Sequence, residues 1–424
     1  MTSIVTSMSP AQIAALTTSQ IRGMSTTDIQ ALSTTQLAAM RTDQIAALET
    51  QDIVVISSDG LAALNSAQVS AITTADIAVL SSDQFNALDD DLNALKTSQI
   101  SALTSDQIST LSSADISVLS SGQVAAFTTK QIQSLSSEQF SFFDSSQLAG
   151  LSTSQIKALS TDQLDAIDAH LSTLKTSQII GLTSAQLQSL GTDDVASLTS
   201  GQLQSLTTAQ IQSLTTDQLD ALDNSLGSLK TSQIAALTTA QVSGLTTDAL
   251  QNLTSAQVGA LTTAQLSNMK TDQLDVLDSA QLSGLTSAQI KALSTDQLDA
   301  LDADLATLKT SQIVGLTTDQ LQSLDTADIQ ELTTAQVASL TTSQAQALTP
   351  QQIIALKYDQ IASINVKDIA VLTTQQIVSI ETDDIQHLTT DQIAALTTTQ
   401  VRSLPSDQVG ALSTDQVSHL NLFA

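Results

Sequence analysis

The sequence predicts an all-α protein: a solenoid, or superhelix, of short capped helices, with one helix of about five to seven residues in each eight-residue repeat. Three observations support this prediction. A large apolar residue recurs every eight residues from Met8 to Leu420, a Ser or Thr usually stands three residues before a Gln, and the three prolines occupy only positions that a helix start tolerates.

The repeat reads L-[ST]-[ST]-x-Q-[ILV]-x-x, as in LTTAQIQS from Leu206, and we number its positions one to eight. There are 48 octads and four heptads, and the heptads begin at Leu88, Ile167, Leu222 and Leu301. A shift of 134 residues overlays IKALSTDQLDA at Ile156 on the same string at Ile290. We therefore expect one continuous repeat domain over residues 1–424, with a higher-order repeat between about 95–228 and 229–362.

The start of each helix is predicted at position two. A Ser or Thr there, with Gln at position five, forms a capping box in which each residue bonds the backbone N–H of the other. Asp at position four complements the helix dipole. Positions six and nine share a helix face and are predicted to form the core. Where position two is Lys or Arg, we expect the Thr at position three to take over the cap.

The prolines support the same boundaries. Pro10 and Pro350 stand at position three, which is the first helical residue, and Pro405 stands at position two. A single continuous helix is disfavoured, because its apolar stripe would slip by about 80° per octad. The alternative fold is a β-solenoid, although Ala, Gln and Asp are poor strand residues.

The four heptads are predicted to be tighter or longer helices that reset the phase of the winding chain. In LDADLATL the apolar residues Leu301, Leu305 and Leu308 form one helical stripe, Asp302 can cap its start, and Lys309 places a cation at its end. The other heptads follow the same plan, so the four should lie at equivalent places in the superhelix. In these other three heptads, the Asp that can cap the start and the Lys that follows the end are Asp89 and Lys96, Asp168 and Lys175, and Asp223 and Lys230.

Stacking must supply the stability that one octad lacks, because ordering eight residues costs on the order of 8–16 kcal/mol in backbone entropy. The glutamine at position five either completes a local capping box or also forms a ladder between stacked repeats. The first and last repeats, MSPAQIAAL and LSTDQVSHL, look like all the others. We therefore expect the chain to associate with itself end to end, and its Ser, Thr and Ala surface allows lateral packing as well.

Composition bears on partners and location. The net charge is −29, the pI is about 4.1, and only 13 Lys and Arg are scattered along the chain. We therefore expect neither nucleic acid nor an anionic membrane as a partner. No apolar run reaches the roughly 18 residues of a membrane span. The stretch MTSIVTSMSP lacks the features of a secretory signal, so export would use another route.

No catalytic, cofactor-binding or metal site is predicted. His170, His387 and His419 lie far apart in the sequence, and Tyr358 is the single tyrosine. The acidic stretch Asp89–Leu92 lacks the glycine and alternating ligands of a calcium loop. No nucleophile elbow, phosphate-binding loop or dinucleotide fingerprint occurs. We expect that the protein is not an enzyme and needs no cofactor, and that it has no small-molecule ligand.

The tandem ALTTAQIAAL-type octads resemble low-complexity surface and secreted proteins of Gram-negative bacteria, which are often labelled haem-utilisation or RTX-like. The glycine-rich nonapeptides of RTX proteins are missing here. The resemblance implies secretion without an N-terminal signal peptide and an extracellular or cell-surface location. The sequence thus favours a self-assembling structural protein, a subunit of an extracellular filament, sheath or surface layer. The alternative is a secreted adhesin or ligand-binding surface solenoid.

Overall fold

The computed structural model describes residues 4–421, apart from the side chains of residues 89, 90, 223, 224, 302 and 303. The described residues form helices and no strand, so the all-α prediction is confirmed and the β-solenoid alternative is wrong for them. Contacts between α-carbons divide the chain into two compact bodies, an N-terminal body (Met1–Leu214) and a C-terminal body (Thr215–Ala424). The expectation of one continuous domain stays a prediction.

The elements of the N-terminal body are α-helices of four to six residues (α) and 3-10 helices (η). They are η1 Ile4–Ser7, α1 Pro10–Ala14, α2 Thr18–Arg22, α3 Thr26–Gln30, α4 Thr34–Ala39, α5 Thr42–Ile45, α6 Thr50–Ile53, α7 Ser58–Ala62, α8 Ser66–Val69, α9 Thr74–Val79, α10 Ser82–Asn86, η2 Asp89–Ala94, α11 Thr97–Ile100, α12 Ser105–Ser109, α13 Ser113–Val118, α14 Ser121–Ala125, α15 Thr129–Ser134, α16 Ser137–Phe140, α17 Ser145–Leu148, α18 Thr153–Ala158, α19 Thr161–Asp165, η3 Asp168–Thr173, α20 Thr176–Ile179, α21 Ser184–Ser189, α22 Thr192–Ala196, α23 Ser200–Ser205 and α24 Thr208–Ser213.

The C-terminal body continues in the same way, with helices of the same lengths. Its elements are α25 Thr216–Asp220, η4 Asp223–Ser228, α26 Thr231–Ile234, α27 Thr239–Gly244, α28 Thr247–Gln251, α29 Ser255–Val258, α30 Thr263–Ser267, α31 Thr271–Asp275, α32 Ser279–Leu282, α33 Ser287–Ala292, α34 Thr295–Asp299, η5 Asp302–Thr307, α35 Thr310–Ile313, α36 Thr318–Ser323, α37 Thr326–Glu331, α38 Thr334–Ser339, α39 Thr342–Ala347, α40 Pro350–Ala355, α41 Tyr358–Ser363, α42 Val366–Ile369, α43 Thr374–Val378, α44 Thr382–Ile385, α45 Thr390–Ala395, α46 Thr398–Ser403, α47 Ser406–Ala411 and α48 Thr414–Ser418.

Each octad is one α-helical turn followed by an extended joint, as α14 shows. The N-cap Ser120 is extended (φ −72°, ψ 157°), and its carbonyl accepts the first helical bond from the N–H of Val124 at 3.0 Å. The N–H of Phe127 then bonds the carbonyl of Val124 at 3.2 Å, which closes the helix with a tighter three-residue turn. The octad therefore re-initiates a helix every eight residues instead of extending one.

The predicted helix starts are confirmed at the prolines. Pro10 and Pro350 are the first residues of α1 and α40, where the missing N–H costs nothing, and Pro405 is the N-cap of α47. The expectation for Lys and Arg at position two was wrong. Lys96 itself is the N-cap of α11, and Thr97 is the first helical residue, because the backbone N–H of Lys96 still bonds the side chain of Gln99.

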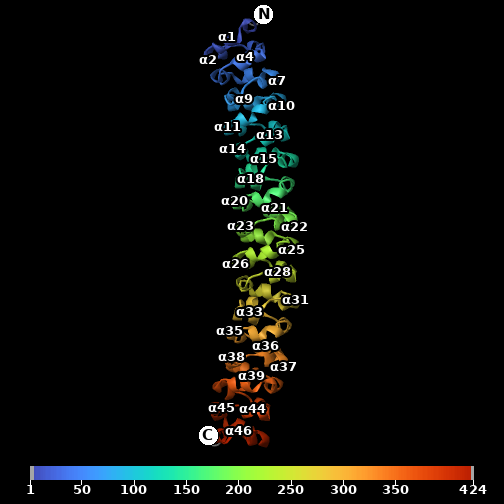
Figure 1. Ribbon diagram of the computed structural model, residues 1–424, viewed down its shortest axis with the longest axis vertical. Coiled ribbons are helices and arrows are strands. Elements are labelled where there is room, and N and C mark those ends of the chain that lie inside the picture. The colour runs from blue at the N-terminus through green and yellow to red at the C-terminus, as the bar shows by residue number, and fades with distance from the viewer. Residues whose placement is uncertain (1–3, 422–424) are drawn as a thin grey trace. The chain divides into compact units, whose positions relative to one another are not determined.

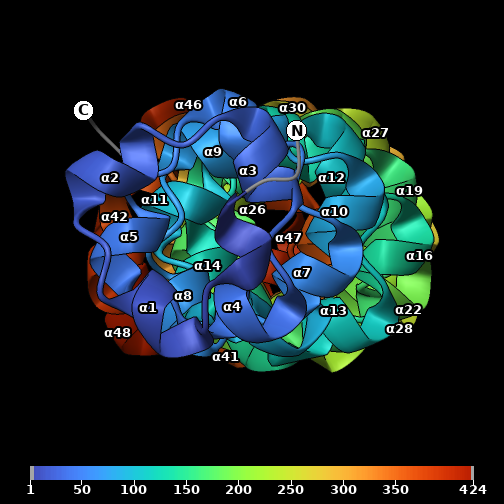
Figure 2. The ribbon, with the colours of Figure 1, turned by 90° about the horizontal axis from the view of Figure 1, so that it is seen from above.

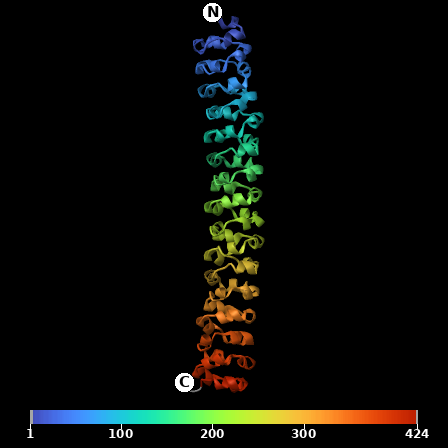
Figure 3. The same cartoon turned by 60° about the vertical axis from the view of Figure 1, so that its left-hand side comes forward.

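Within each body, helices follow one another in chain order (Figure 1), and successive turns stack. The view from above shows the helices of the N-terminal body arranged in a ring (Figure 2), and the side view shows the turns one above another within each body (Figure 3). Within each body, helices pack on the helix three repeats later, for example α12 on α15 and α35 on α38. The core consists of positions one and six, represented by Ile116 and Leu119, which are 0% and 4% exposed.

The four heptads are 3-10 helices, η2 to η5, so the prediction of a tighter helix is confirmed. Their apolar stripe is buried, as Leu305 and Leu308 show at 0% and 4% exposure. A 3-10 helix rises about 2.0 Å per residue against 1.5 Å in an α-helix, so fewer residues span a similar length. The predicted caps Asp89, Asp223 and Asp302 lie outside the described side chains.

The fourth predicted cap, Asp168, is the first residue of η3 and not its N-cap, which is Ile167. The carboxylate of Asp168 instead accepts from the adjacent N–H of Ala169. The prediction that Asp caps the start of the heptad is therefore wrong at this repeat, because the 3-10 turn begins one residue earlier than an octad helix would.

Within each body the two short repeats lie in one stack of helices. In the N-terminal body, Gln123 of α14 bonds the carbonyl of Leu92 in η2, α14 packs on α17, and Ser145 of α17 lies 3.1 Å from His170 of η3. In the C-terminal body, Gln257 of α29 bonds the carbonyl of Leu226 in η4, α29 packs on α32, and α32 packs on η5. In each body the two short repeats are thus linked through one series of contacting helices, and the prediction that all four occupy equivalent places stays a prediction.

Candidate assembly interface

The glutamine at position five joins its own helix to the preceding turn. The Oε1 atom of Gln147 accepts from the N–H of its N-cap Asp144 at 2.9 Å, which is the predicted capping box. Its Nε2 atom donates to the carbonyls of Ile116 and Leu119, both at 2.7 Å. The side chain is 2% exposed. The sequence left a local cap and a ladder between repeats as alternatives. The side-chain amide of Gln147 forms both, because its oxygen makes the cap and its nitrogen makes the ladder.

The ladder follows a fixed spacing in both bodies. The carbonyls bonded by one glutamine lie 31 and 28 residues earlier, as at Gln147 and at Gln352. Where a heptad intervenes, the spacing falls to 30 and 27 residues, as at Gln99. The first acceptor is the carbonyl at position six of the fourth preceding repeat, and the second is the carbonyl at position one of the third preceding repeat. The glutamine thus reaches back over three to four repeats, and the helices pack on the helix three repeats away. One turn therefore contains between three and four repeats.

In the outermost described turn of the N-terminal body, two glutamines at position five bond only their own helix start. Gln12 and Gln20 are exposed, and their Oε1 atoms accept from the N–H groups of Ser9 and Thr17, both at 2.8 Å. Within residues 4–421, neither Nε2 atom donates a hydrogen bond. Leu16 and Met24, at position one, are only half-buried here, whereas the same position is buried inside the stack. This turn therefore presents amide donors beside apolar side chains.

The last described turn of the C-terminal body carries exposed apolar side chains and carbonyl acceptors. Val409 and Val417 stand at position six and are 41% and 42% exposed, whereas Ile393 at the same position is 0% exposed. The carbonyls of Val409 and Val417 each accept one helical bond, at 3.4 and 3.3 Å. Inside the stack a glutamine supplies a second bond to such carbonyls, and no glutamine of the described residues does so here. This turn therefore presents acceptors beside exposed valines.

Basic residues at position two also reach the preceding turn. Lys309 Nζ donates to the carbonyl of Ser283 at 2.8 Å, and Lys357 Nζ donates to that of Gln330 at 2.8 Å. The guanidinium of Arg41 bonds the carbonyls of Ala14 and Leu16. The expectation that Lys309 complements the dipole of its own short helix was therefore wrong, because its side chain caps a helix in another turn.

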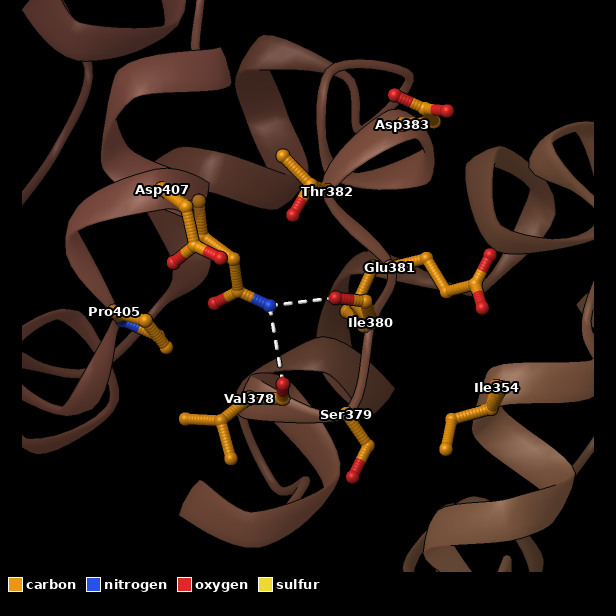
Figure 4. Close-up of a pocket in the computed structure, with 10 residues that line it drawn as sticks. Ile354, Val378, Ser379, Ile380, Glu381, Thr382, Asp383, Pro405 and Asp407 are labelled. Carbon is orange, nitrogen blue, oxygen red and sulfur yellow. Dashed lines mark hydrogen bonds between the residues drawn. The ribbon is translucent and has the colours of Figure 1, made fainter.

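A depression of about 570 Å³ lies on the C-terminal body (Figure 4), between Ile354, Glu381, Asp383, Pro405 and Asp407. Gln408 lies at its base and donates to the carbonyls of Val378 and Ile380, at 3.2 and 2.6 Å. Its Oε1 atom is buried and has no partner among the described residues. The cause is Pro405, which stands at the N-cap and has no N–H to donate.

The three histidines remain apart in the described structure. His170 faces Ser145, His387 stacks on Tyr358 with 4.8 Å between ring centroids, and His419 Nδ1 lies 2.8 Å from the carbonyl oxygen of Asp415. Among residues 4–421, no group of three His, Asp or Glu side chains is arranged to hold a metal ion. In the acidic stretch Asp89–Leu92, Asp91 accepts from the hydroxyl of Ser66, and the side chains of Asp89 and Asp90 are not described.

Asp replaces the glutamine at position five in several repeats and cannot complete the ladder. The Asp52 side chain is 1% exposed, its Oδ2 accepts from the N–H of Glu49 at 3.2 Å, and its Oδ1 has no partner among the described residues. Burial raises the pKa of Asp52, and the negative charges of Glu49 and Asp76 raise it further. Burial likewise raises the pKa of Asp194 and Asp384.

Comparison with known proteins identifies the repeat. The model of the family described as "ALTTAQ repeat" matches more than half of the chain. The matched residues are 5–34, 13–50, 24–58, 53–90, 89–121, 108–145, 116–153, 224–255, 274–304, 302–333, 322–357, 361–398 and 393–421.

The other comparisons add little. No curated protein matches the chain. A solved structure described as "Structure of APUM23-GGAAUUGACGG" is 12% identical, with a TM-score of 0.19, over 97% of this chain and 94% of that one. A likeness at that TM-score supports no conclusion. Within the part of the chain that the structure describes, no helix is long and apolar enough to cross a membrane.

Proposed function

Because the chain belongs to the ALTTAQ repeat family and its outermost turns are chemically complementary, we propose that it is a structural protein that polymerises with itself. In this proposal it is a subunit of an extracellular filament, sheath or surface layer, without a catalytic role. The observation that carries the proposal is a chemical complementarity: within the described residues, the Nε2 atoms of Gln12 and Gln20 donate no bond, and the carbonyls of the exposed Val409 and Val417 accept only one each.

The interior of the chain supports this pairing. Inside the stack, a repeat that carries glutamine at position five donates its amide to two carbonyls of the preceding turn, and position six of that turn is buried, as Gln147 shows over Ile116 and Leu119. A second copy of the chain carries the same side chains at the same spacing. The contact between two molecules would therefore use the same glutamine amides, carbonyls and apolar side chains that join successive turns within one chain. Each hydrogen bond contributes about 1 kcal/mol, and burial of the valines adds to it.

The test compares the 424-residue chain with a variant that carries Gln12→Glu and Gln20→Glu. The glutamate oxygens still accept from Ser9 and Thr17, so α1 and α2 keep their caps, but a carboxylate would then face the carbonyls of the neighbouring molecule. Losing at least one bond of about 1.4 kcal/mol raises the concentration needed for half-association about tenfold or more. Light scattering after size-exclusion chromatography and electron microscopy measure this shift.

The matched control carries Gln133→Glu and Gln188→Glu, which change the net charge equally at exposed positions of α15 and α21. This control should assemble like the unmodified chain. A native chain that remains monomeric at high concentration contradicts the proposed function. The extracellular location is tested separately, by immunogold labelling of intact cells that produce the protein.

A further inference from the structure

We propose that successive molecules join in a single register, in which Gln12 of one molecule bonds the carbonyls of Val409 and Leu412 of the preceding molecule, and Gln20 bonds those of Val417 and Leu420. This inference rests on the proposed function and adds the identity of the interface. It concerns contacts between two copies of the 424-residue chain.

The spacing of the ladder leads to this register. Inside the stack one glutamine bonds two carbonyls that lie three residues apart, such as Ile116 and Leu119, and the next glutamine, eight residues later, bonds a pair eight residues later. Val409 and Leu412 are three residues apart, and Val417 and Leu420 repeat them eight residues later. Gln12 and Gln20 are themselves eight residues apart, so both amides meet complete acceptor pairs.

If one molecule is shifted along the other by one octad, in either direction, its amides pair less well with the carbonyls of the preceding molecule. With Gln12 over Val401 and Leu404, the third repeat places the carboxylate of Asp28 over the carbonyl oxygens of Val417 and Leu420. With Gln12 over Val417 and Leu420, Gln20 meets no carbonyl pair of the described residues. Only the proposed register uses both glutamines and keeps Asp28 away from the acceptors.

The apolar side chains agree with this register. Val409 and Val417 are 41% and 42% exposed, whereas Ile116, which Gln147 and its helix cover, is 0% exposed. In the proposed register the helices that carry Gln12 and Gln20, α1 and α2, lie over Val409 and Val417 in the same way. The half-buried Leu16 and Met24 border this contact. The junction therefore buries the two valines that the single chain leaves exposed.

Engineered cysteines can measure the register directly, because the chain has no cysteine of its own. Within the stack, a position-three side chain reaches position four of the third following repeat, 25 residues later: between octads the hydroxyl of Ser58 bonds the carbonyl of Asp83 at 3.4 Å, and at a short repeat Ser145 lies 3.1 Å from His170. The same relation across the junction pairs Thr414 with Ala11 in the proposed register. It pairs Thr414 with Ser19 if the molecules join one octad earlier.

Two double variants of the full chain are compared, Ala11→Cys with Thr414→Cys and Ser19→Cys with Thr414→Cys. All three positions are exposed, and circular dichroism checks that both variants fold. After assembly, each is treated with a short bismaleimide and separated on a denaturing gel. The proposed register gives a ladder of covalent oligomers for the first variant and at least tenfold less product for the second.

The reverse result, with the ladder in the second variant only, overturns the register and leaves the proposed function standing. Equal crosslinking in both variants also overturns a single register. Absence of assembly by light scattering overturns the proposed function, and the register with it. The two failures are therefore distinguishable, because light scattering reports association and the cysteine pairs report the alignment.

Discussion

At the scale of single residues, the amide at position five bonds in two directions, and each substitution there has a specific cost. Gln147 uses its oxygen for the helix start and its nitrogen for the preceding turn. At Gln408 the oxygen loses its donor because Pro405 occupies the N-cap. At Asp52 the nitrogen is missing, so two oxygens are buried where a donor is needed. Both departures should be measurable as local losses of stability.

We expect Pro405→Thr to stabilise the repeats around α47 by about 1–2 kcal/mol. The threonine supplies the N–H that Gln408 lacks and a hydroxyl that caps the helix, and these gains exceed the smaller entropic benefit of proline. Slower amide hydrogen exchange across residues 378–412 would show the effect. Pro350→Thr is the control, because Gln352 already accepts from Thr349 at 2.9 Å, and it should bring no comparable gain.

The raised pKa of Asp52 should make the surrounding turns more stable in acid. Since the folded-state pKa lies above the unfolded value of about 3.9, the stabilising contribution is complete below that value and is lost as pH rises through the folded-state pKa. Asp52→Gln should remove this pH dependence and add about 1 kcal/mol at neutral pH through a restored donor. Hydrogen exchange measured between neutral pH and about pH 4 tests it. Asp59→Asn, at an exposed position, should leave the dependence unchanged.

At the scale of elements, the helices are too short to be stable alone and depend on close contact between turns. Isolated helices below about 12 residues are marginal in water, and those here have four to six. Glycines at position eight mark the closest approaches. A Cβ at Gly284 would collide with the backbone oxygen of Ser255, whereas a Cβ at Gly201 would meet nothing within 4 Å. The spacing between turns is therefore fixed partly by the absence of a side chain.

Gly284→Ala should destabilise the C-terminal body by about 1–3 kcal/mol, because the backbone of α29 must move to admit the methyl group. Gly201→Ala, inside α23, should instead increase the free energy of unfolding by up to about 1 kcal/mol, since alanine is the better helix former. Urea titrations of both variants, followed by circular dichroism, provide the comparison. Equal effects of the two substitutions on the free energy of unfolding would show that the close approach of the turns at Gly284 does not exclude a methyl group.

At the scale of the whole molecule, charge opposes the association that the outermost turns favour. The chain carries a net charge of −29, so two copies repel each other at low ionic strength. The contacts proposed at the junction are hydrogen bonds and apolar burial, which salt weakens little. The balance between the charge repulsion and these contacts should therefore depend on ionic strength.

Raising the salt concentration from about 0.01 M to 0.15 M shortens the Debye length from about 30 to 8 Å and should promote assembly. Light scattering at constant protein concentration should show a larger average mass at the higher salt. A decrease in mass would mean that ion pairs, rather than the proposed ladder, hold the molecules together. The Gln12→Glu, Gln20→Glu variant should remain less associated at both salt concentrations.

The sequence by itself determined what depends on neighbours within a few residues. The Ser or Thr three residues before Gln, the octad spacing and Pro10 at the first helical position specify where each helix starts, because capping bonds form locally. The burial of Ile116 and Leu119 also follows from their shared helix face. The four- and three-residue spacing of Leu301, Leu305 and Leu308 predicted a continuous helix in the heptad, tighter or longer than in the octads, and the structure shows the tighter form.

Only the tertiary structure decided which atoms meet across turns. The carbonyls that receive the Nε2 of Gln147, the reach of Lys309 to Ser283 and the exposure of Val409 all depend on the number of repeats per turn. That number is the sum of small rotations between successive helices, which packing sets and no short motif encodes. The sequence therefore identified the glutamine as a cap, and the fold made it the link between turns.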